Sequence, residues 1–314
     1  MGKRALPSIL LLIAAASIGV NVLQWSTRTT LAGLVDEWRE QYPYLSPSRA
    51  LIAQEDMVIN VRPLRDQIRA EVARWPSGSV TAYVEFLNTG SNIIINPDLY
   101  IYPASLIKTP IVMAAAMKVE RGEWQRTNEL VLMENDRDPG WGTLYNERVG
   151  TTFTIERLIR EVILHSDNTA YNILYRNLSG AELDAMVEEL GLEQLFDADG
   201  KLSAREYGRI LRSLYTASYL NKAHSQWLLG LMDESPYVQY LESGLPTGLP
   251  FAHKFGENDI ESVMGDAGIA YLPDRPYLIT VMIDRKQAGM TLDQATSLLR
   301  EISSMTHAYF ASVK

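Results

Sequence analysis

The sequence predicts an α/β (α+β) fold in which an antiparallel five-stranded sheet is flanked by terminal helices and carries an inserted all-α subdomain. Two observations predict it: strand-like alternation of apolar and polar residues occurs at both ends of the chain, and helical periodicity fills the middle. A chain of 314 residues with 46% hydrophobic residues is long enough to bury a large core or two subdomains. A cleft between two such parts is a common place for a ligand.

The elements of the predicted sheet come from two separate segments. An amphipathic helix at residues 63–74 precedes the first strand, and a turn of sequence Asn-Thr-Gly-Ser joins the first strand to the second as a hairpin. The predicted strands are residues 80–87, 92–96, 251–256, 264–272 and 277–283. A closing helix then runs from residue 292 to about 312, and Thr291 is suited to cap its N-terminus.

Helices dominate from about residue 104 to 242. These boundaries predict an α/β subdomain formed by residues 61–101 and 247–314, and a helical subdomain at residues 102–246, which together form a catalytic domain at residues 61–314. Pro110 lies inside the first of these helices, where it is expected to be an irregularity with an energetic cost.

The amino terminus has the features of a membrane segment. Lys3 and Arg4 precede an apolar run at residues 8–25, and an 18-residue helix spans about 27 Å, close to the thickness of a bilayer core. Residues 1–25 are therefore predicted to be a retained signal anchor, with a stalk at residues 26–60 and the remainder extracellular or periplasmic. The alternative is a signal peptide cleaved near Ala14-Ala15-Ala16 and a secreted protein.

Composition excludes several classes of function. The net charge is -9 and no clustered basic face is evident, which argues against a nucleic-acid partner. The chain has no cysteine, so disulfides, cysteine-ligated zinc and thiol catalysis are excluded. The four histidines show no metal-ligand spacing. Neither a metal nor a cofactor is expected.

Three short motifs carry the chemistry. They are Ser105-Leu-Ile-Lys108, Ser166-Asp-Asn168 and Lys254-Phe-Gly256, in this order along the chain. Each is weak alone, because short motifs recur by chance. Their order, and the local structure expected around each, make the set informative.

The first motif combines a nucleophile with a base. Ser105 is expected near the start of a buried helix, where the positive field of the N-terminus favours developing negative charge. Lys108 lies three residues on, hence on the same helical face, and a desolvated lysine with a lowered pKa can activate a serine hydroxyl. The alternative is a serine cap followed by a lysine that reaches to the surface.

The other two motifs supply further polar groups. Ser166 can relay a proton and Asn168 can bind a substrate amide or hold Lys108, although the tripeptide also suits a helix cap. Lys254 lies on a predicted strand and can attract a substrate carboxylate, while Gly256 would let a ligand backbone approach that strand. The alternative for Lys254 is an ordinary exposed lysine.

With these motifs the chain, over about residues 60–314, resembles the serine β-lactamase and penicillin-binding protein superfamily, most closely class A β-lactamase-like serine hydrolases. The resemblance implies that Ser105 is the acylated nucleophile, Lys108 its base or proton shuttle, and Ser166 a proton relay. It implies that Asn168 and Lys254 hold the substrate.

By the same resemblance, the oxyanion hole would be formed by the backbone N–H groups of Ser105 and Glu257. Aromatic residues in the region of Trp141 and Tyr145 can wall the cleft in this superfamily. A surface loop with exposed aromatic residues is the alternative.

The chain departs from the family pattern in two ways. Phe255 stands where the third motif usually has threonine or serine, which removes a hydroxyl that would contact a substrate carboxylate. No Glu-x-x-Leu-Asn sequence follows the second motif, so the glutamate that directs the deacylating water in class A enzymes is missing. The segment between two predicted capping boxes, Ser179 with Glu182 and Ser203 with Glu206, is too short for that loop.

These features predict a membrane-anchored serine hydrolase that acts through a Ser105 acyl-enzyme on D-Ala-D-Ala-like peptidoglycan stem peptides or β-lactam amides, with weak β-lactam deacylation. A true class A-type β-lactamase is one alternative. A non-catalytic cell-envelope binding or scaffold protein on the same fold is another. The expected partners are the substrate and the inner or cytoplasmic membrane, which residues 8–25 would enter.

Overall fold

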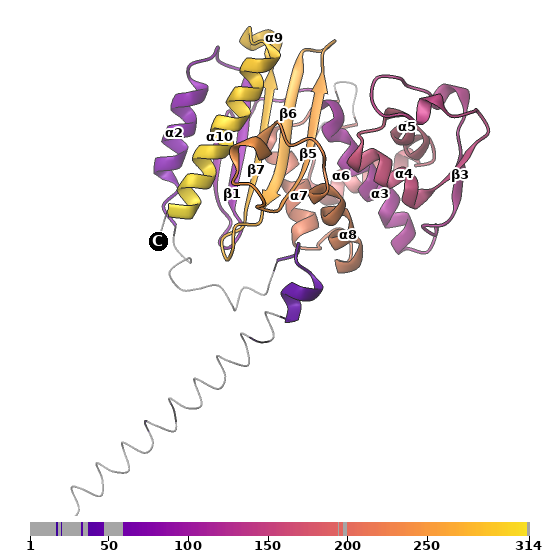
Figure 1. Ribbon diagram of the computed structural model, residues 1–314, viewed down its shortest axis with the longest axis horizontal. Coiled ribbons are helices and arrows are strands. Elements are labelled where there is room, and N and C mark those ends of the chain that lie inside the picture. Colours follow the sequence, from indigo (N-terminus) through magenta and orange to yellow (C-terminus); the bar gives the residue numbers. More distant parts are fainter. Residues whose placement is uncertain are drawn as a thin grey trace, which may run out of the picture.

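In a computed structural model of the chain, a sheet lies beside a helical region (Figure 1). The structure describes residues 37–46, 59–193, 195–196 and 200–312, together with residues 17, 20 and 33. Apart from residues 17 and 20, the predicted signal anchor lies outside the described residues, as does most of the stalk. In the part of the chain that is described, no helix combines the length and the apolar character needed to cross a membrane.

The sheet is antiparallel and has the strand order β2-β1-β7-β6-β5. Its strands are β1 (Val80–Phe86), β2 (Ser91–Ile95), β5 (Phe251–Asn258), β6 (Val263–Ala270) and β7 (Tyr277–Asp284). The two ends of the sequence meet where β1 pairs with β7, with Val84 opposite Ile279. The predicted fold class is therefore confirmed, and β5, which carries the third motif, is an edge strand among the described residues.

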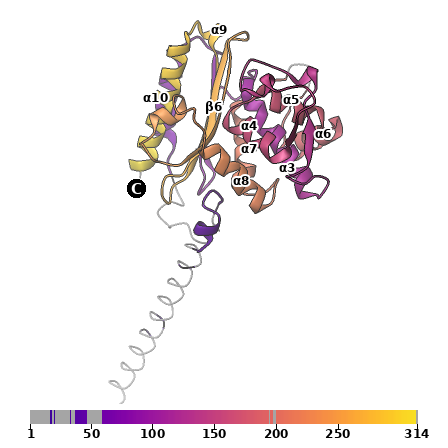
Figure 2. The ribbon, with the colours of Figure 1, turned by 45° about the vertical axis from the view of Figure 1, so that its right-hand side comes forward.

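The terminal helices α2 (Arg62–Val72) and α10 (Leu292–Ser312) cover one face of this sheet (Figures 1 and 2). The short helix α9 (Arg285–Ala288) connects β7 to α10. The Thr291 side chain accepts a hydrogen bond from the Gln294 backbone N–H at 3.2 Å, so the predicted cap of the closing helix is confirmed. The rings of Phe86 and Phe310 stack at 5.3 Å and tie α10 to the sheet.

The helical region lies on the other side of the sheet (Figure 2). Its helices are α3 (Lys108–Glu120), α4 (Ile155–Leu164), α5 (Asn168–Arg176), α6 (Gly180–Leu190), α7 (Ala204–Tyr215) and α8 (Lys222–Asp233). Helix α7 packs closely on the sheet, because a Cβ at Gly208 would lie 2.4 Å from the Tyr83 ring. The core of the helical region is centred on α3, whose residues 108–116 are all buried.

Short elements complete the fold. They are the 3-10 turns η3 (Ala104–Ile107), η4 (Glu134–Asp136), η5 (Leu144–Asn146) and η6 (Leu241–Gly244), and the small sheet of β3 (Glu129–Val131) and β4 (Thr152–Thr154). The sequence analysis did not anticipate β3 and β4, whose three-residue length leaves little alternation to detect. Pro110 is the third residue of α3, where backbone N–H groups have no partner within the helix, so the expected cost is avoided.

Candidate active site

Ser105 lies in η3, the tight turn that leads into α3. The preceding residue, Ala104, has a φ of 47°, an uncommon backbone conformation for a residue other than glycine. Strand β5 presses against this turn at Gly256, where a Cβ would lie 2.7 Å from the Pro103 carbonyl oxygen and 2.9 Å from the Leu106 nitrogen. Glycine is therefore required here for packing against the serine turn, and contact of its backbone with a ligand stays a prediction.

Lys108 is the first residue of α3 and is buried, with 2% of its surface exposed. Its Nζ donates hydrogen bonds to the Ser166 carbonyl oxygen, to Ser166 Oγ at 3.1 Å and to Asn168 Oδ1 at 2.6 Å. The lysine therefore does not reach to the surface, and the alternative interpretation of the first motif is wrong. Its contacts join the first motif to the second.

Burial lowers the pKa of Lys108 to about 7, although the negative charges of Asp167 and Asp138 act in the opposite direction. About half of the Lys108 side chains are then neutral at pH 7. A neutral lysine has a lone pair, which lets it accept the Ser105 proton as a general base.

This pKa predicts the pH dependence of acylation. The folded-state pKa is lowered, so the neutral, reactive form of Lys108 gains population as the pH rises. We expect the second-order rate constant for acylation of Ser105 to rise tenfold per pH unit well below pH 7 and to level off above about pH 7 to 8. Intact-mass kinetics between pH 5 and pH 9 measure it. A flat profile would show that Lys108 does not control the reaction.

The second motif lies between α4 and α5 and has two roles. Asp167 is the N-cap of α5, since its side chain accepts a hydrogen bond from the Ala170 N–H at 2.8 Å. Ser166 has a φ of 52° and, like Asn168, faces Lys108. The cap and the polar site are therefore both present in one tripeptide, carried by different residues.

Lys254 of the third motif is fully buried, with 1% of its surface exposed, so it is not an ordinary exposed lysine. Its Nζ donates to Ser166 Oγ at 3.0 Å and to the Phe255 carbonyl oxygen at 2.9 Å. Burial and the positive charge of Lys108 hold its pKa well below the ordinary value. Two lysines thus converge on one hydroxyl, which can move protons between them.

A pocket of about 610 Å³ opens beside Ser105. It is lined by Tyr102, Ala104, Ser105, Ile107, Lys108, Asp138, Gly140, Trp141, Asn168, Tyr171, Asn172, Glu257, Asn258, Asp259 and Ile260. Four of the seven predicted site residues are in this lining: Ser105, Lys108, Asn168 and Glu257. The other three, Ser166, Lys254 and Gly256, lie behind it. Tyr145 is outside the lining as well, whereas Trp141 walls the pocket.

Four aromatic side chains form a cluster that reaches the pocket through Trp141. The ring of Phe255 lies 5.3 Å from Trp141, 4.2 Å from Tyr237 and 5.1 Å from Tyr240, measured between ring centroids. The Lys254 Nζ lies 4.3 Å from the centroid of the Phe255 ring. The sequence analysis did not identify Tyr237 and Tyr240, which come from the segment after α8, because no motif marks that segment.

Glu206, which follows the segment between the two capping boxes, is not free to act as a catalytic base. Glu206 is 1% exposed and forms the predicted capping box with Ser203, and it also accepts a hydrogen bond from the Glu193 N–H. The box of Ser179 and Glu182 is confirmed as well. Asp197 and Asp199, which also lie between the two capping boxes, are outside the described residues.

The carboxylates that line the pocket come from other segments, and the sequence analysis did not single out Asp138 or Asp259. Asp138 accepts hydrogen bonds from Asn168 Nδ2 at 3.0 Å and from the Gly140 N–H at 2.7 Å. The Glu257 carboxylate accepts one from the Tyr240 hydroxyl at 2.8 Å. The signal that could have found Asp138 was its place in the Asp-Pro-Gly-Trp segment, which also carries Trp141.

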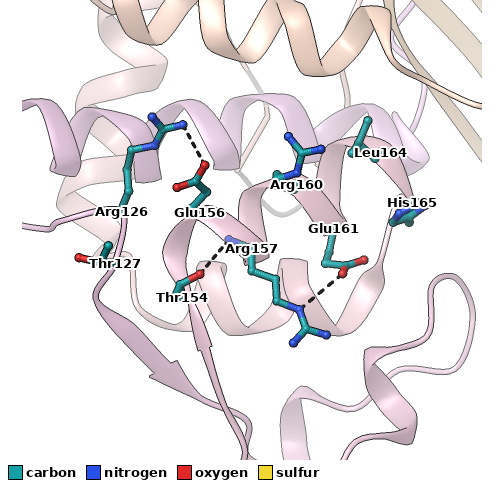
Figure 3. A pocket seen from close by; sticks show the side chains of 9 residues that line it. All are labelled: Arg126, Thr127, Thr154, Glu156, Arg157, Arg160, Glu161, Leu164 and His165. Carbon is teal, nitrogen blue, oxygen red and sulfur yellow. Dashed lines mark hydrogen bonds and ion pairs between the residues drawn. The ribbon is translucent and has the colours of Figure 1, made fainter.

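A second hollow, which runs along α4, is a weaker candidate for a functional site (Figure 3). It is lined by Arg126, Thr127, Thr154, Glu156, Arg157, Arg160, Glu161, Leu164 and His165. Its arginines are paired with carboxylates in Arg126–Glu156, Arg157–Glu161 and Arg160–Glu234. Their charge is therefore already balanced, and the hollow holds neither the nucleophile nor its lysines.

A serine that lines one pocket with a lysine of lowered pKa, where this lysine contacts a second serine and an asparagine and a second lysine contacts the same second serine, defines a serine hydrolase of the β-lactamase and transpeptidase type. The comparisons identify the family. The model of the "Beta-lactamase enzyme family" matches residues 63–310, so the chain belongs to that family.

Individual relatives agree with this assignment. A β-lactamase of Streptomyces lavendulae is 24% identical over 226 residues, which cover 66% of this chain and 74% of the relative. The β-lactamase VEB-1 of Pseudomonas aeruginosa is 22% identical over 249 residues, 71% of this chain and 82% of that protein.

Among solved structures, PBP-A is 27% identical with a TM-score of 0.72, covering 80% of this chain and 97% of PBP-A. A mutant of PBP-A was solved as an acyl-enzyme complex with penicillin G. The extended-spectrum β-lactamase TLA-3 has the same fold, with 19% identity and a TM-score of 0.72 over 81% of this chain and all of the other.

Proposed function

We propose that this protein is an extracytoplasmic, membrane-anchored serine hydrolase that acts through an acyl-enzyme on Ser105. Its acyl donors are D-Ala-D-Ala-like peptides, β-lactams or related amides and esters. The observation that carries the proposal is the convergence of Lys108 and Lys254 on Ser166 beside the pocket that Ser105 lines. Such an arrangement gives a serine hydroxyl the base it needs to act as a nucleophile.

The proposed reaction has two stages. In the first, neutral Lys108 takes the Ser105 proton while Oγ attacks the carbonyl carbon, and the backbone N–H groups of Ser105 and Glu257 stabilise the oxyanion. Collapse of the tetrahedral intermediate breaks the scissile bond, and the proton passes from Lys108 through Ser166 to the leaving group. In the second stage, water or an amine takes the acyl group and Ser105 is restored.

The second stage is proposed to be slow for β-lactams. Hydrolysis of an acyl-enzyme needs a base beside the water, and Glu206, a buried acid between the second and third motifs, is engaged in a helix cap. Asp138 lines the pocket but is hydrogen-bonded to Asn168 and Gly140. The acyl-enzyme complex of a PBP-A mutant with penicillin G shows that a similar protein can hold a penicillin acyl group.

Acylation and deacylation can be followed together by intact mass. We expect full-length protein in detergent, incubated with a fluorescent penicillin or a carboxylate-free peptide thioester, to form an adduct that persists after excess reagent is removed. The adduct should be absent in Ser105→Ala. A penicillin adduct that clears within seconds would favour a true class A-type β-lactamase. No adduct with either reagent would favour a non-catalytic envelope protein.

Location is proposed from the charge pattern of the amino terminus. Lys3 and Arg4 before the apolar run favour a cytoplasmic N-terminus and a catalytic domain outside. Protease added to intact cells, or to spheroplasts if the cells have an outer membrane, should then degrade the domain. Full protection from protease would contradict an extracytoplasmic location, and release of a shortened chain into the medium or periplasm would indicate signal cleavage.

A further inference from the structure

The buried lysine of the third motif is already occupied by groups of the protein. Lys254 gives hydrogen bonds to Ser166 Oγ and to the Phe255 carbonyl oxygen, and its Nζ faces the Phe255 ring at 4.3 Å. With 1% of its surface exposed, Lys254 is absent from the pocket lining. A substrate carboxylate could reach its charge only if the aromatic side chains moved away.

Lys254 adjoins an aromatic wall, which is formed by the side chains of Phe255, Trp141 and Tyr237. Phe255 is itself 1% exposed and contacts Trp141, which lines the pocket, and Tyr237. Burying an ionised carboxylate against such a surface without a hydrogen-bonding partner is costly. Phe255 also offers no hydroxyl to a carboxylate. This end of the pocket is therefore suited to an uncharged group.

The charges in the pocket lining oppose a carboxylate too. Lys108 is the one basic residue among the residues described there, and the pKa of about 7 leaves it only partly charged at neutral pH. Glu257 and Asp138 are hydrogen-bonded by neutral donors, which do not cancel their charge. The third carboxylate, Asp259, is paired with Arg285 at 2.5 Å. Like charges within several ångströms repel.

We infer that the acyl donor of this enzyme carries no carboxylate on the leaving-group side of its scissile bond, and that an uncharged group, such as a primary amide or an ester, packs there against Trp141, which Phe255 supports from behind. The inference rests on the proposed acylation of Ser105 and narrows its substrate class to carboxylate-free amides and esters. The bonds made and broken are those of the proposed reaction: Ser105 Oγ gains the acyl group, and the leaving group gains the Ser105 proton.

Two thioesters that differ in one group test this inference. Both carry the same acyl peptide on a thioglycolyl leaving group, which ends in a carboxylate in one and in a primary amide in the other. The released thiol and the intact mass of full-length protein in detergent give the second-order acylation rate constants. We expect the amide to acylate Ser105 roughly tenfold faster or more, because Lys108, the one basic residue in the described lining, is already hydrogen-bonded to Ser166 and Asn168.

Substitution of Phe255 shows whether the aromatic wall sets this preference. Phe255→Thr removes the ring and supplies a hydroxyl, and it should shift the amide-to-acid rate ratio by roughly tenfold towards the acid. Phe255→Leu removes the ring but adds no polar group, and it should keep the amide preference. The ratio compares two substrates on one protein, so a partly unfolded sample does not distort it.

The outcomes separate this inference from the proposed function. An acid that reacts as fast as the amide, or faster, would overturn the inference while leaving acylation of Ser105 intact. A ratio that stays the same in Phe255→Thr as in Phe255→Leu would also overturn the role of the aromatic wall. No Ser105 adduct from either thioester would instead contradict the proposed function.

Discussion

Replacing Lys108 with arginine is expected to lower the rate of Ser105 acylation by about a thousandfold while the protein stays folded. The reason is that arginine keeps the positive charge and can donate to the same oxygens, yet it cannot lose its proton at any pH that proteins tolerate. The substitution therefore removes the base but keeps a positive charge at this position. Acylation is measured by intact mass with the thioester whose leaving group ends in a primary amide. The aromatic wall is expected to slow the reaction of this thioester least.

A matched control is available on the same helix. Lys118 also lies on α3, but it pairs with Glu182 and Glu123 at the protein surface, away from the pocket. Lys118→Arg should retain the wild-type acylation rate, because an arginine can make the same ion pairs. Lys108→Arg should also lose the rise in rate between pH 5 and pH 7. A Lys108→Arg rate within tenfold of wild type would show that another group deprotonates Ser105.

The contacts of Lys108 show which features of the site could be predicted from the sequence. A spacing of three residues within a helix places Ser105 and Lys108 on one face, and this periodicity is visible in the sequence alone. The contact between Lys108 and Asn168 joins segments 60 residues apart, yet the known motif set made it predictable. The five strands of the large sheet and the two capping boxes were predictable because each leaves a local pattern in the sequence.

The environment of Lys254 could not be predicted in this way. The Phe255 ring that its Nζ faces packs against Trp141 and Tyr237, which lie more than a hundred residues and 17 residues earlier in the sequence, respectively. No local pattern reports which side chains from distant segments will cover a strand lysine. The sequence showed that Phe255 replaces a hydroxyl residue, but the aromatic cluster that it completes appears only when the segments are brought together.

The contacts of Asp167 also could not be predicted from the sequence. Its motif was recognised, but two of its hydrogen bonds come from the loop that carries Trp141. Its carboxylate is fully buried and accepts hydrogen bonds from the backbone N–H groups of Thr143 at 2.7 Å, Leu144 at 2.9 Å and Ala170 at 2.8 Å. A Cβ on Gly142, which has a φ of +86°, would lie 2.1 Å from one carboxylate oxygen. The loop that carries Trp141 is thus wrapped tightly around this side chain.

Asp167→Ala is therefore expected to lower the free energy of unfolding by about 3 to 5 kcal/mol, because it leaves buried N–H groups without partners and removes a helix cap. Urea denaturation of the full-length protein in detergent measures the change, read as a shift in midpoint at constant slope. Asp167→Asn keeps one oxygen acceptor and should lose less. Asp184→Ala, at an exposed position of α6, should change stability by at most about 0.5 kcal/mol.

Asp167→Ala also tests whether the stability of this loop affects the preference for amide over acid. If the Asp167 carboxylate holds the loop of residues 138–144 in place, Asp167→Ala should also weaken the amide-over-acid preference, since Trp141 loses its position against Phe255. Asp184→Ala should leave that ratio as in wild type. A loss of stability with an unchanged ratio would mean that Asp167 supports the fold alone. An Asp167→Ala protein less than 1 kcal/mol below wild type would show that other contacts hold the loop.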